Sequence, residues 1–396
     1  MTDLRAMPEK RPSLQPPTSP LERLPEEWAE LLTTWGEPRF RGAQVFRWIH
    51  QRGVFDAAAM TDLPKSLRER LLGENIALPL DVSVFHRSTD GTRKLLLKMS
   101  DGKEIESVLI PQGDPADLAV VSEDEDEGVA EATVAPTAIS QCISTQVGCA
   151  MGCVFCASGV AGLKRHLSAA EIVAQVMMGR AKAEPSERIR NVVLMGMGEP
   201  LHNYDAVARA LVLLSHPDGI GLSTRRVTLS TSGLVPQIDR LGADFGGQVQ
   251  LAVSLHAVDN TKRSLLMPIN RKHPIEELME SLRRYPLPKR RRITIEYTLI
   301  AGRNDDVRDA DRLAVLLRGI PAKVNLIPMN PVDGSPLNAP EFGGVDAFQE
   351  QLRSRGVAAF VRRTRGDDIA AACGQLALHG EKRRLRVDYS AGGSGS

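Results

Sequence analysis

The sequence contains few cysteines and no long apolar segment. Its 396 residues include no run of about 18 consecutive apolar residues, which excludes a membrane-spanning helix. Residues 1–20 lack the apolar core of a secretory signal peptide, so we do not expect export. Five cysteines are too few to build a disulfide-stabilised secreted fold. These absences favour a cytoplasmic protein without a membrane partner.

The composition is otherwise that of a soluble globular protein. Apolar residues make up 42% of the chain and charged residues 25%. A chain of this length suits one large domain with an accessory part, or two or three smaller domains. Four of the five cysteines fall between Cys142 and Cys156. Such clustering indicates metal or redox chemistry in a reducing compartment.

Charge is distributed unevenly along the chain. The net charge is +1, but residues 112–138 contain eight acidic side chains and neither Lys nor Arg, which leaves +9 on the remainder. The basic residues of that remainder gather in short clusters at 164–166, 225–226, 289–292, 362–365 and 382–384. Basic clusters suit a partner with a phosphate backbone, and solvated helix ends have the same composition.

Three segments precede the acidic stretch. Residues 1–20 contain five prolines and little apolar material, and we expect a disordered tail. Residues 21–80 follow a helical pattern and predict a small accessory domain, whose basic residues beside turns suit RNA contact or plain helix packing. Residues 81–111 switch to strand patterns on both sides of Asp101-Gly102, which predicts a β-hairpin.

The rest of the chain is predicted to be one large domain with two irregular segments. Residues 112–138 are too acidic to pack and predict a mobile surface insertion. Residues 386–396 match no structural pattern and predict a flexible tail. Residues 139–385 hold the core, in which β-rich runs alternate with helical patterns.

This alternation predicts an α/β fold with a parallel sheet in an open or partial barrel. The predicted strands are 143–147, 191–195, 226–230, 249–255, 293–299 and 323–328, with a further one near 359–363. The predicted helices are 168–182, 204–214, 235–241, 275–284, 307–317 and 347–355. Ser168 with Glu171 forms a capping box at the first of them. In such barrels the chemistry lies at the carboxyl ends of the strands.

A CxxxCxxC motif carries the strongest chemical signal. Cys149, Cys153 and Cys156 follow a predicted strand on one tight loop, with Phe155 before the last cysteine. Three thiolates can hold three irons of a [4Fe–4S] cluster and leave the fourth iron open to a small molecule. A structural zinc site is the alternative, with Cys142 or His166 as the fourth ligand.

This motif and the GMGEP loop that ends the next predicted strand resemble the radical S-adenosylmethionine (SAM) superfamily. Further motifs agree with one family in order and content: CISTQVGC from Cys142, GMGEPLHN from Gly196, VTLSTSG from Val227, SLH from Ser254, MPIN from Met267, MNP from Met329 and RGDDIAAACGQL from Arg365. Residues 21–385 are thereby similar to the RNA adenine methyltransferases of the RlmN/Cfr type.

The resemblance implies a partial (β/α)6 radical-SAM barrel at residues 139–385, behind an RNA-binding N-terminal domain. It also implies two cofactors, one [4Fe–4S] cluster on the three cysteines of the motif and SAM. The residues that it assigns to SAM are Gly198, Glu199, Ser230, Ser254, Leu255, His256 and Asn330.

Three further residues receive catalytic roles from the resemblance alone. Cys373 is assigned as the methyl carrier, Cys142 as the thiol that resolves the adduct by forming a disulfide bond with it, and Glu106 as the proton acceptor. Without the family, Cys373 resembles a small buried apolar residue. Glu106 alone has the pattern of a solvent-facing strand residue.

The implied reaction is methylation of C2 of a specific adenine in 23S rRNA, and also in tRNA. It uses two SAM molecules, a methyl-cysteine intermediate and an external electron donor such as flavodoxin, and we expect a monomeric enzyme. One alternative is adenine C8 methylation of 23S rRNA. The other is a non-catalytic Fe–S protein that binds RNA or senses redox state. Such a protein would need neither Cys373 nor Cys142.

Overall fold

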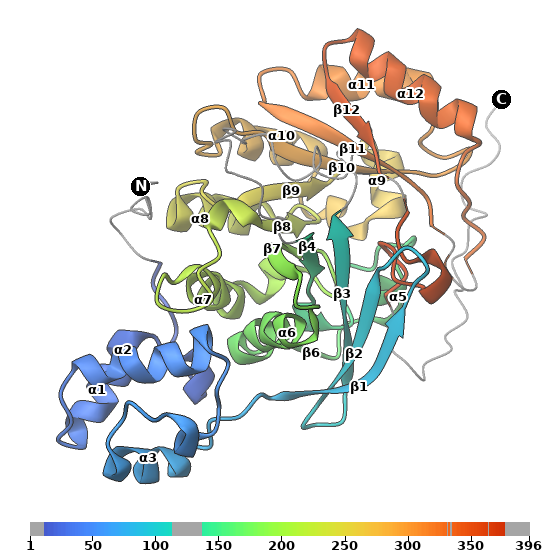
Figure 1. The fold of residues 1–396 in the computed structure, drawn as a ribbon. Helices are drawn as coiled ribbons and strands as arrows, with labels where there is room; N and C mark the ends of the chain where they lie inside the picture. The colour runs from blue at the N-terminus through green and yellow to red at the C-terminus, as the bar shows by residue number, and fades with distance from the viewer. Residues whose placement is uncertain (1–11, 113–136, 331, 333–334, 363, 377–396) are drawn as a thin grey trace, which may run out of the picture.

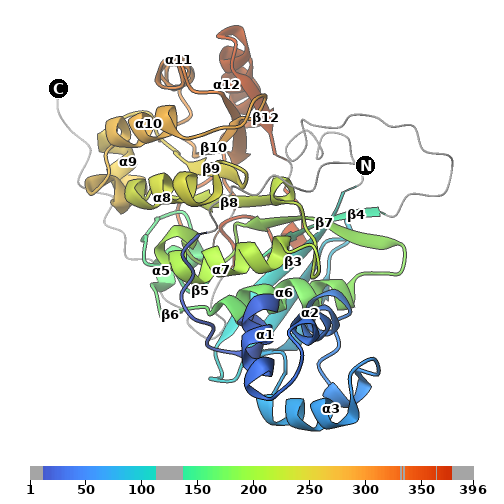
Figure 2. The ribbon, with the colours of Figure 1, turned by 90° about the vertical axis from the view of Figure 1, so that its left-hand side faces the viewer.

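A ten-stranded sheet organises the protein, and the computed structural model describes residues 12–112, 137–330, 332, 335–362 and 364–376 (Figure 1). The acidic insertion from residue 113 to 136 and the flexible tail predicted at 386–396 lie outside the described residues. A small helical unit at the N-terminus lies beside helices of the barrel in both views (Figures 1 and 2). No helix in the described ranges has the length and apolar character needed to cross a membrane.

The N-terminal unit is built on three helices, α1 (Pro25–Thr34), α2 (Phe40–Phe46) and α3 (Lys65–Leu71). Helix α1 begins with Pro25, whose fixed φ suits a first helical position, and it buries Trp28 completely. Helices α1 and α2 cross closely at Gly42, where a Cβ atom would lie 2.5 Å from the backbone nitrogen of Ala29. A larger residue at Gly42 would therefore push the two helices apart.

Two arginines of the barrel hold this unit in place. Arg209 donates to the Glu27 carboxylate at 2.9 Å and, through Nε, to the carbonyl of Gln15 at 3.0 Å. Arg180 donates to the carbonyl of His50 at 3.4 Å. Residues 12–20 were predicted as part of a disordered tail, but Gln15 lies against the barrel through the buried Arg209.

The strands of the large sheet follow the order β1-β2-β3-β4-β7-β8-β9-β10-β11-β12. The first four pair antiparallel, and all pairs from β4 to β12 are parallel. Their bounds are β1 Leu80–Arg87, β2 Arg93–Met99, β3 Glu104–Gln112, β4 Thr137–Cys142, β7 Glu187–Leu194, β8 Val227–Thr231, β9 Gln250–Ser254, β10 Ile293–Leu299, β11 Ala322–Pro328 and β12 Ala358–Val361. The short strands β5 (Gln146–Val147) and β6 (Arg165–His166) form a separate pair.

The helices of the core domain follow the strands in alternation, as the sequence predicts. They are α5 Ala157–Ala161, α6 Ala169–Lys182, α7 Tyr204–Ser215, α8 Val235–Phe245, α9 Asn260–Leu266, α10 Ile275–Arg284, α11 Val307–Leu316 and α12 Phe342–Ser354. The longer ones cover the outer side of the sheet (Figures 1 and 2). The predicted α/β class and partial barrel are confirmed.

Packing explains the different character of these helices. Helix α6 is buried on nearly all sides, because the sheet lies on one side and the N-terminal unit on the other. Its predicted capping box is present, since Glu171 N donates to Ser168 Oγ at 3.2 Å and Ser168 N donates to Glu171 Oε2 at 2.9 Å. Helix α10 instead buries one stripe, which includes Leu278 and Leu282. Each such leucine contributes roughly 1.5–3 kcal/mol to the free energy of unfolding.

The predicted hairpin at Asp101-Gly102 is present, and it extends the barrel sheet. Strand β3 continues to Gln112, which pairs with Ala138 of β4. Gln112 and residues 137–138 therefore belong to strands, whereas the sequence placed them in the insertion. The antiparallel pairing of β3 with β4 continues up to both ends of the insertion. The acidic composition of the insertion is the reason that the sequence pattern assigned these pairing residues to it.

The first parallel strand was predicted at residues 143–147, which is wrong. Strand β4 ends at Cys142, and only Ile143 continues the ladder by donating to the carbonyl of Val193 at 3.0 Å. The backbone nitrogens of Thr145 and Gln146 both donate to the carbonyl of Met197, at 2.8 and 3.1 Å. The segment thus turns across the end of the barrel, where it leads into the cysteine loop.

Candidate active site

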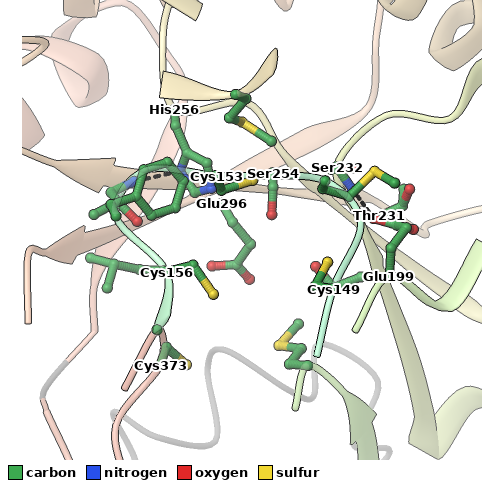
Figure 3. A pocket seen from close by; sticks show the side chains of 18 of the residues that line it. Cys149, Cys153, Cys156, Glu199, Thr231, Ser232, Ser254, His256, Glu296 and Cys373 are labelled. Carbon is green, nitrogen blue, oxygen red and sulfur yellow. Dashed lines mark hydrogen bonds between the residues drawn. The ribbon is translucent and has the colours of Figure 1, made fainter. Parts of the chain in front are cut away.

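A cavity lies at the carboxyl ends of the parallel strands, and most of the predicted site residues line it (Figure 3). Those residues are Cys149, Cys153, Cys156, Gly198, Glu199, Ser230, Ser254, His256, Asn330 and Cys373. Leu255 is fully buried and does not line it. Cys142 lines a neighbouring pocket, and Glu106 lines neither. The positions that the resemblance assigned thus come together from widely separated parts of the chain.

The cysteine loop is held by backbone hydrogen bonds to two other parts of the site. Val154 N donates to the carbonyl of Leu266 at 3.1 Å, and Ala157 N donates to the carbonyl of Gly374 at 2.9 Å. Helix α5 begins directly after Cys156, whose thiol faces the first backbone N–H groups of that helix. The second bond joins the loop to the segment that carries Cys373.

Burial controls the ionisation of the three cysteines. It raises the pKa of Cys149 to about 12, that of Cys153 well above its ordinary value, and that of Cys156 in the same direction. Neighbouring thiols add to the rise, because two thiolates close together repel each other. As iron ligands these sulfurs must be thiolates, and the positive charge of a bound iron–sulfur cluster would favour the thiolate over the protonated form.

The donor set fits a cluster better than a single ion. Among the described residues, no three His, Cys, Asp or Glu side chains converge as ligands of one metal ion. A [4Fe–4S] cluster makes a different demand, because each of its cysteines binds a different iron. The zinc alternative required Cys142 or His166 as a fourth ligand, and neither lines this cavity.

Glu199 is held with its carboxylate at the cavity wall. It is 3% exposed, and its two oxygens accept from the backbone nitrogens of Leu201 at 3.1 Å and Ser232 at 2.7 Å. Burial raises its pKa, and hydrogen bonds from Ser232 are the main opposing influence. Gly198 adopts a φ of 110°, and a Cβ atom there would lie 2.6 Å from the Cβ of Gln146. Glycine is therefore required beside this carboxylate.

His256 connects the cysteine loop to β10. Its Nδ1 accepts from the backbone nitrogen of Thr298 at 2.9 Å, so the neutral ring carries its proton on Nε2. Burial lowers its pKa to about 3. The ring packs edge-on against Phe155 with centroids 4.7 Å apart. His256 is thus a neutral group that supports the aromatic side chain next to Cys156.

Arg263 of α9 is a structural residue that the sequence did not reveal. It is completely buried and donates to the carbonyls of Leu255, Ser254 and Ser232 and to Asn270 Oδ1, at 2.7 to 3.1 Å. One guanidinium therefore joins the ends of β8 and β9. The sequence shows only one more arginine in a short helix, with no signal that it is buried.

Cys373 lies between the cavity and the pocket that contains Cys142. It lines both, together with Asn330 and Arg362. Asn330 Nδ2 donates to the carbonyl of Cys373 at 3.0 Å, which ties this segment to the end of β11. Burial raises the pKa of Cys142 to about 12, and the nearby Cys373 adds to the rise. Both thiols are free in this structure.

Glu106 is buried, whereas its alternation in the sequence indicated a solvent-facing residue. It is 2% exposed and forms an ion pair with Lys94, Nζ to Oε1 at 3.0 Å. Lys94 Nζ also donates to the carbonyl of Ala370 at 3.2 Å. The prediction of exposure was wrong because β3 lies between two other strands and is covered by the Cys373 segment, defined here as residues 364–376.

The β1–β2 turn, residues 88–92, is hydrogen-bonded to the same segment. Ser88 Oγ and Thr89 N donate to the Asp368 carboxylate at 2.5 and 3.1 Å, and Gly366 N donates to Asp90 Oδ2 at 3.0 Å. Partial burial raises the pKa of Asp90, but backbone hydrogen bonds outweigh this effect and lower the pKa to about 2. The β1–β2 turn thereby anchors the Cys373 segment.

The basic clusters differ in their surroundings. Arg165 is engaged in ion pairs with Asp101 at 2.7 Å and Glu171 at 2.8 Å. Arg225 and most of residues 289–292 are exposed, whereas Arg362 lines the cavity. Residues 382–384 lie outside the part of the chain that the structure describes.

Comparison with known proteins agrees with this geometry. Residues 143–314 match the Radical SAM superfamily, and residues 24–76 match the ribosomal RNA large subunit methyltransferase N-terminal domain. The chain is 61% identical over 381 residues to the dual-specificity RNA methyltransferase RlmN of Sorangium cellulosum, covering 93% of this chain and 98% of that protein. The RlmN of Anaeromyxobacter dehalogenans is 46% identical over 370 residues, with 92% and 93% covered.

A solved structure extends the likeness to three dimensions. The crystal structure of a radical SAM methyltransferase from Sphaerobacter thermophilus superposes with a TM-score of 0.80 at 43% identity. The match covers 91% of this chain and 99% of that one. The two chains therefore share the same overall fold over nearly their whole length.

Proposed function

Because the chain belongs to the RlmN family of radical SAM RNA methyltransferases, we propose that it methylates C2 of a specific adenine. The proposed substrates are 23S rRNA and tRNA, and the proposed route uses two SAM molecules and a methyl group carried on Cys373. An RNA methyltransferase of this superfamily uses a [4Fe–4S] cluster and SAM. When bound, these supply an activated methyl group, an electron and the radical that starts the reaction.

The position of Cys373 carries this proposal. Its thiol lies in the wall between the cavity of the three motif cysteines and the pocket of Cys142. A methyl group on that sulfur would face the cavity in which SAM and the adenine must meet. The Cys142 thiolate would then attack the sulfur of the base adduct from the other pocket, so that a disulfide bond forms as the bond between sulfur and the methylene carbon breaks. The released carbon would take up a proton and become the methyl group of the base.

The remaining residues position the reactants and handle protons. Cys149, Cys153 and Cys156 would hold the cluster, and Glu199 would accept hydrogen bonds from the amino group of SAM. Glu106 would accept the proton that leaves C2, because its carboxylate is held beside the Cys373 segment through Lys94. An external electron donor such as a flavodoxin would reduce the cluster. With ribosomal RNA as the substrate, the enzyme would act in the cytoplasm.

Product mapping and two cysteine variants test the proposal. Anaerobic turnover with methyl-labelled SAM and unmodified RNA is expected to place label at adenine C2. Cys373→Ala is expected to keep the cluster but methylate no RNA. Cys142→Ala is expected to accumulate protein joined to RNA through Cys373, because release is blocked. Mass spectrometry of the peptide from residue 365 to 376 detects the methyl group and the adduct.

Each alternative predicts a different result. Label at C8 would assign the enzyme to the other regiochemistry and leave the carrier mechanism intact. A sensor protein would bind RNA and cycle its cluster without incorporating label. Normal turnover by Cys373→Ala would contradict the carrier role.

A further inference from the structure

Glu296 of β10 has no assigned role, yet its carboxylate points into the cavity (Figure 3). The side chain is buried, with 4% of its surface exposed. Oε1 accepts from Asn325 Nδ2 at 3.1 Å, whereas Oε2 finds no hydrogen-bond donor among the described residues. Buried carboxylate oxygens are rarely left in this state, so the free oxygen points to a donor on a bound molecule.

Two cations of the protein already balance part of the charge of Glu296. Burial raises its pKa, and the cations Arg362 and Lys323 act in the opposite direction. At Glu199, in contrast, the influences opposing burial are chiefly hydrogen-bond donors. A cationic ligand group such as an ammonium therefore suits Glu199 better, whereas Oε2 of Glu296 suits a neutral hydrogen-bond donor on a ligand.

The surroundings of Oε2 resemble a nucleoside site. Ser254 is paired with Glu296 in the sheet, and Thr298 follows two residues later on the same face. Apolar side chains, including Met267 and Met329, complete the lining nearby. A nucleoside combines a flat apolar base with sugar hydroxyls, and one carboxylate oxygen has lone pairs for two adjacent O–H groups.

We propose that Glu296 Oε2 accepts hydrogen bonds from the sugar hydroxyls of an adenosine unit bound in the cavity. This inference rests on the proposed function, which brings two adenosines to the site. SAM presents both its 2′ and 3′ hydroxyls, whereas a nucleotide within RNA presents only the 2′ hydroxyl. The source of the hydroxyls can therefore be separated by binding experiments.

Glu296→Gln is the informative substitution. Asn325 donates toward one oxygen, so the glutamine carbonyl must take that place and its NH2 group must face the ligand. The NH2 group of the glutamine and the hydroxyl group of the ligand are both hydrogen-bond donors, so the bond to the ligand would be lost. We expect SAM to bind the reconstituted holoenzyme roughly 10- to 100-fold more weakly, measured by anaerobic calorimetry. Glu350→Gln on the exposed side of α12 is the matched control and is expected to bind as the wild type does.

Analogues of SAM lacking the 2′ or 3′ hydroxyl complete the test. The wild type should bind at least one of them more weakly, and Glu296→Gln should add little further loss, because the same contact is removed twice. A loss confined to RNA affinity, and absent when the target nucleotide is 2′-deoxy, would place the hydroxyl on the RNA. Unchanged affinity for both ligands, or losses that simply add, would overturn the assignment.

These measurements do not depend on turnover. The enzyme could fail to give the expected methylated product while Glu296 and the hydroxyl still show the expected coupling in binding. That result would count against the proposed reaction and would still support this contact. Glu296→Gln is nearly isosteric, so we expect its unfolding midpoint to stay close to that of the wild type.

Discussion

Lys94 Nζ lies 3.0 Å from Glu106 Oε1, and both side chains are almost completely buried. The same ammonium donates to the carbonyl of Ala370, three residues before Cys373. A single lysine on the hairpin thus joins the proposed proton acceptor to the segment of the proposed methyl carrier. The hairpin is therefore an integral part of the site, although it precedes the barrel in the chain.

Lys94→Met is expected to lower the free energy of unfolding by about 3–5 kcal/mol, because it removes the ammonium that balances the buried Glu106 carboxylate. Denaturant unfolding measures this loss. The double variant Lys94→Met/Glu106→Leu should recover most of the stability while remaining inactive. Lys65→Met, which removes one partner of the exposed pair with Glu69, should cost less than about 1 kcal/mol. Equal losses in the two single variants would show that burial of the pair has no influence.

Asp90→Asn is expected to loosen the Cys373 segment, because Asp90 accepts a hydrogen bond from the backbone nitrogen of Gly366. The pKa of Asp90 is lowered from 3.8 to about 2, so its stabilising effect is present above the ordinary value and is lost as the pH falls towards 2. The wild type should therefore lose stability between about pH 4 and pH 2 at this site, and the variant should lose less. Thermal unfolding against pH tests this, and hydrogen exchange at residues 366–376 tests the loosening at pH 7.

Local patterns predicted most of the fold, and motifs predicted most of the site. Helix α10 was recognisable because its apolar stripe depends only on its own residues. Strand β4 was misplaced because its pairing with β3 and β7 depends on distant parts of the chain. Glu296 was missed because every residue of β10 is buried, so alternation does not reveal the face that lines the cavity. Arg263 was missed because its acceptors come from three separate segments.

Arg263→Lys is expected to destabilise the site despite conserving the charge. A lysine ammonium cannot reach the four acceptors that the planar guanidinium joins, so the carbonyls of Ser232 and Ser254 lose their donor. We expect a loss of about 3 kcal/mol or more in the free energy of unfolding, measured by denaturant unfolding. Arg283→Lys, at an exposed position of α10, is the matched control. Similar stability of both variants would contradict the bridging role.

Gly198→Ala is expected to weaken SAM binding at least tenfold and to lower stability, because the new methyl group would collide with Gln146 and push the loop that carries Glu199. Gly319→Ala is the control, since Gly319 also has a positive φ, of 76°, but has open space around its Cβ position. Both variants place a Cβ atom at a positive φ, which costs roughly 1–2 kcal/mol, so we attribute a loss of stability well beyond that of the control to the collision. Equal unfolding midpoints and equal SAM affinities would show that the close approach to Gln146 is unimportant.

Cys142 is expected to react with iodoacetamide only slowly near neutral pH. Burial raises its pKa to about 12, so roughly one thiol in ten thousand is ionised at pH 8, and only the thiolate is nucleophilic. The labelling rate should rise about tenfold per pH unit from pH 7 to pH 10 without reaching a plateau. The unfolded chain should instead level off near the ordinary pKa of a thiol. Peptide mass spectrometry after short labelling pulses measures both rates, and a plateau near pH 9 in the folded protein would show that Cys142 is open to solvent. In the proposed route, a Cys142 that is protonated in the folded protein would have to lose its proton before or during its attack on Cys373, because only the thiolate is nucleophilic.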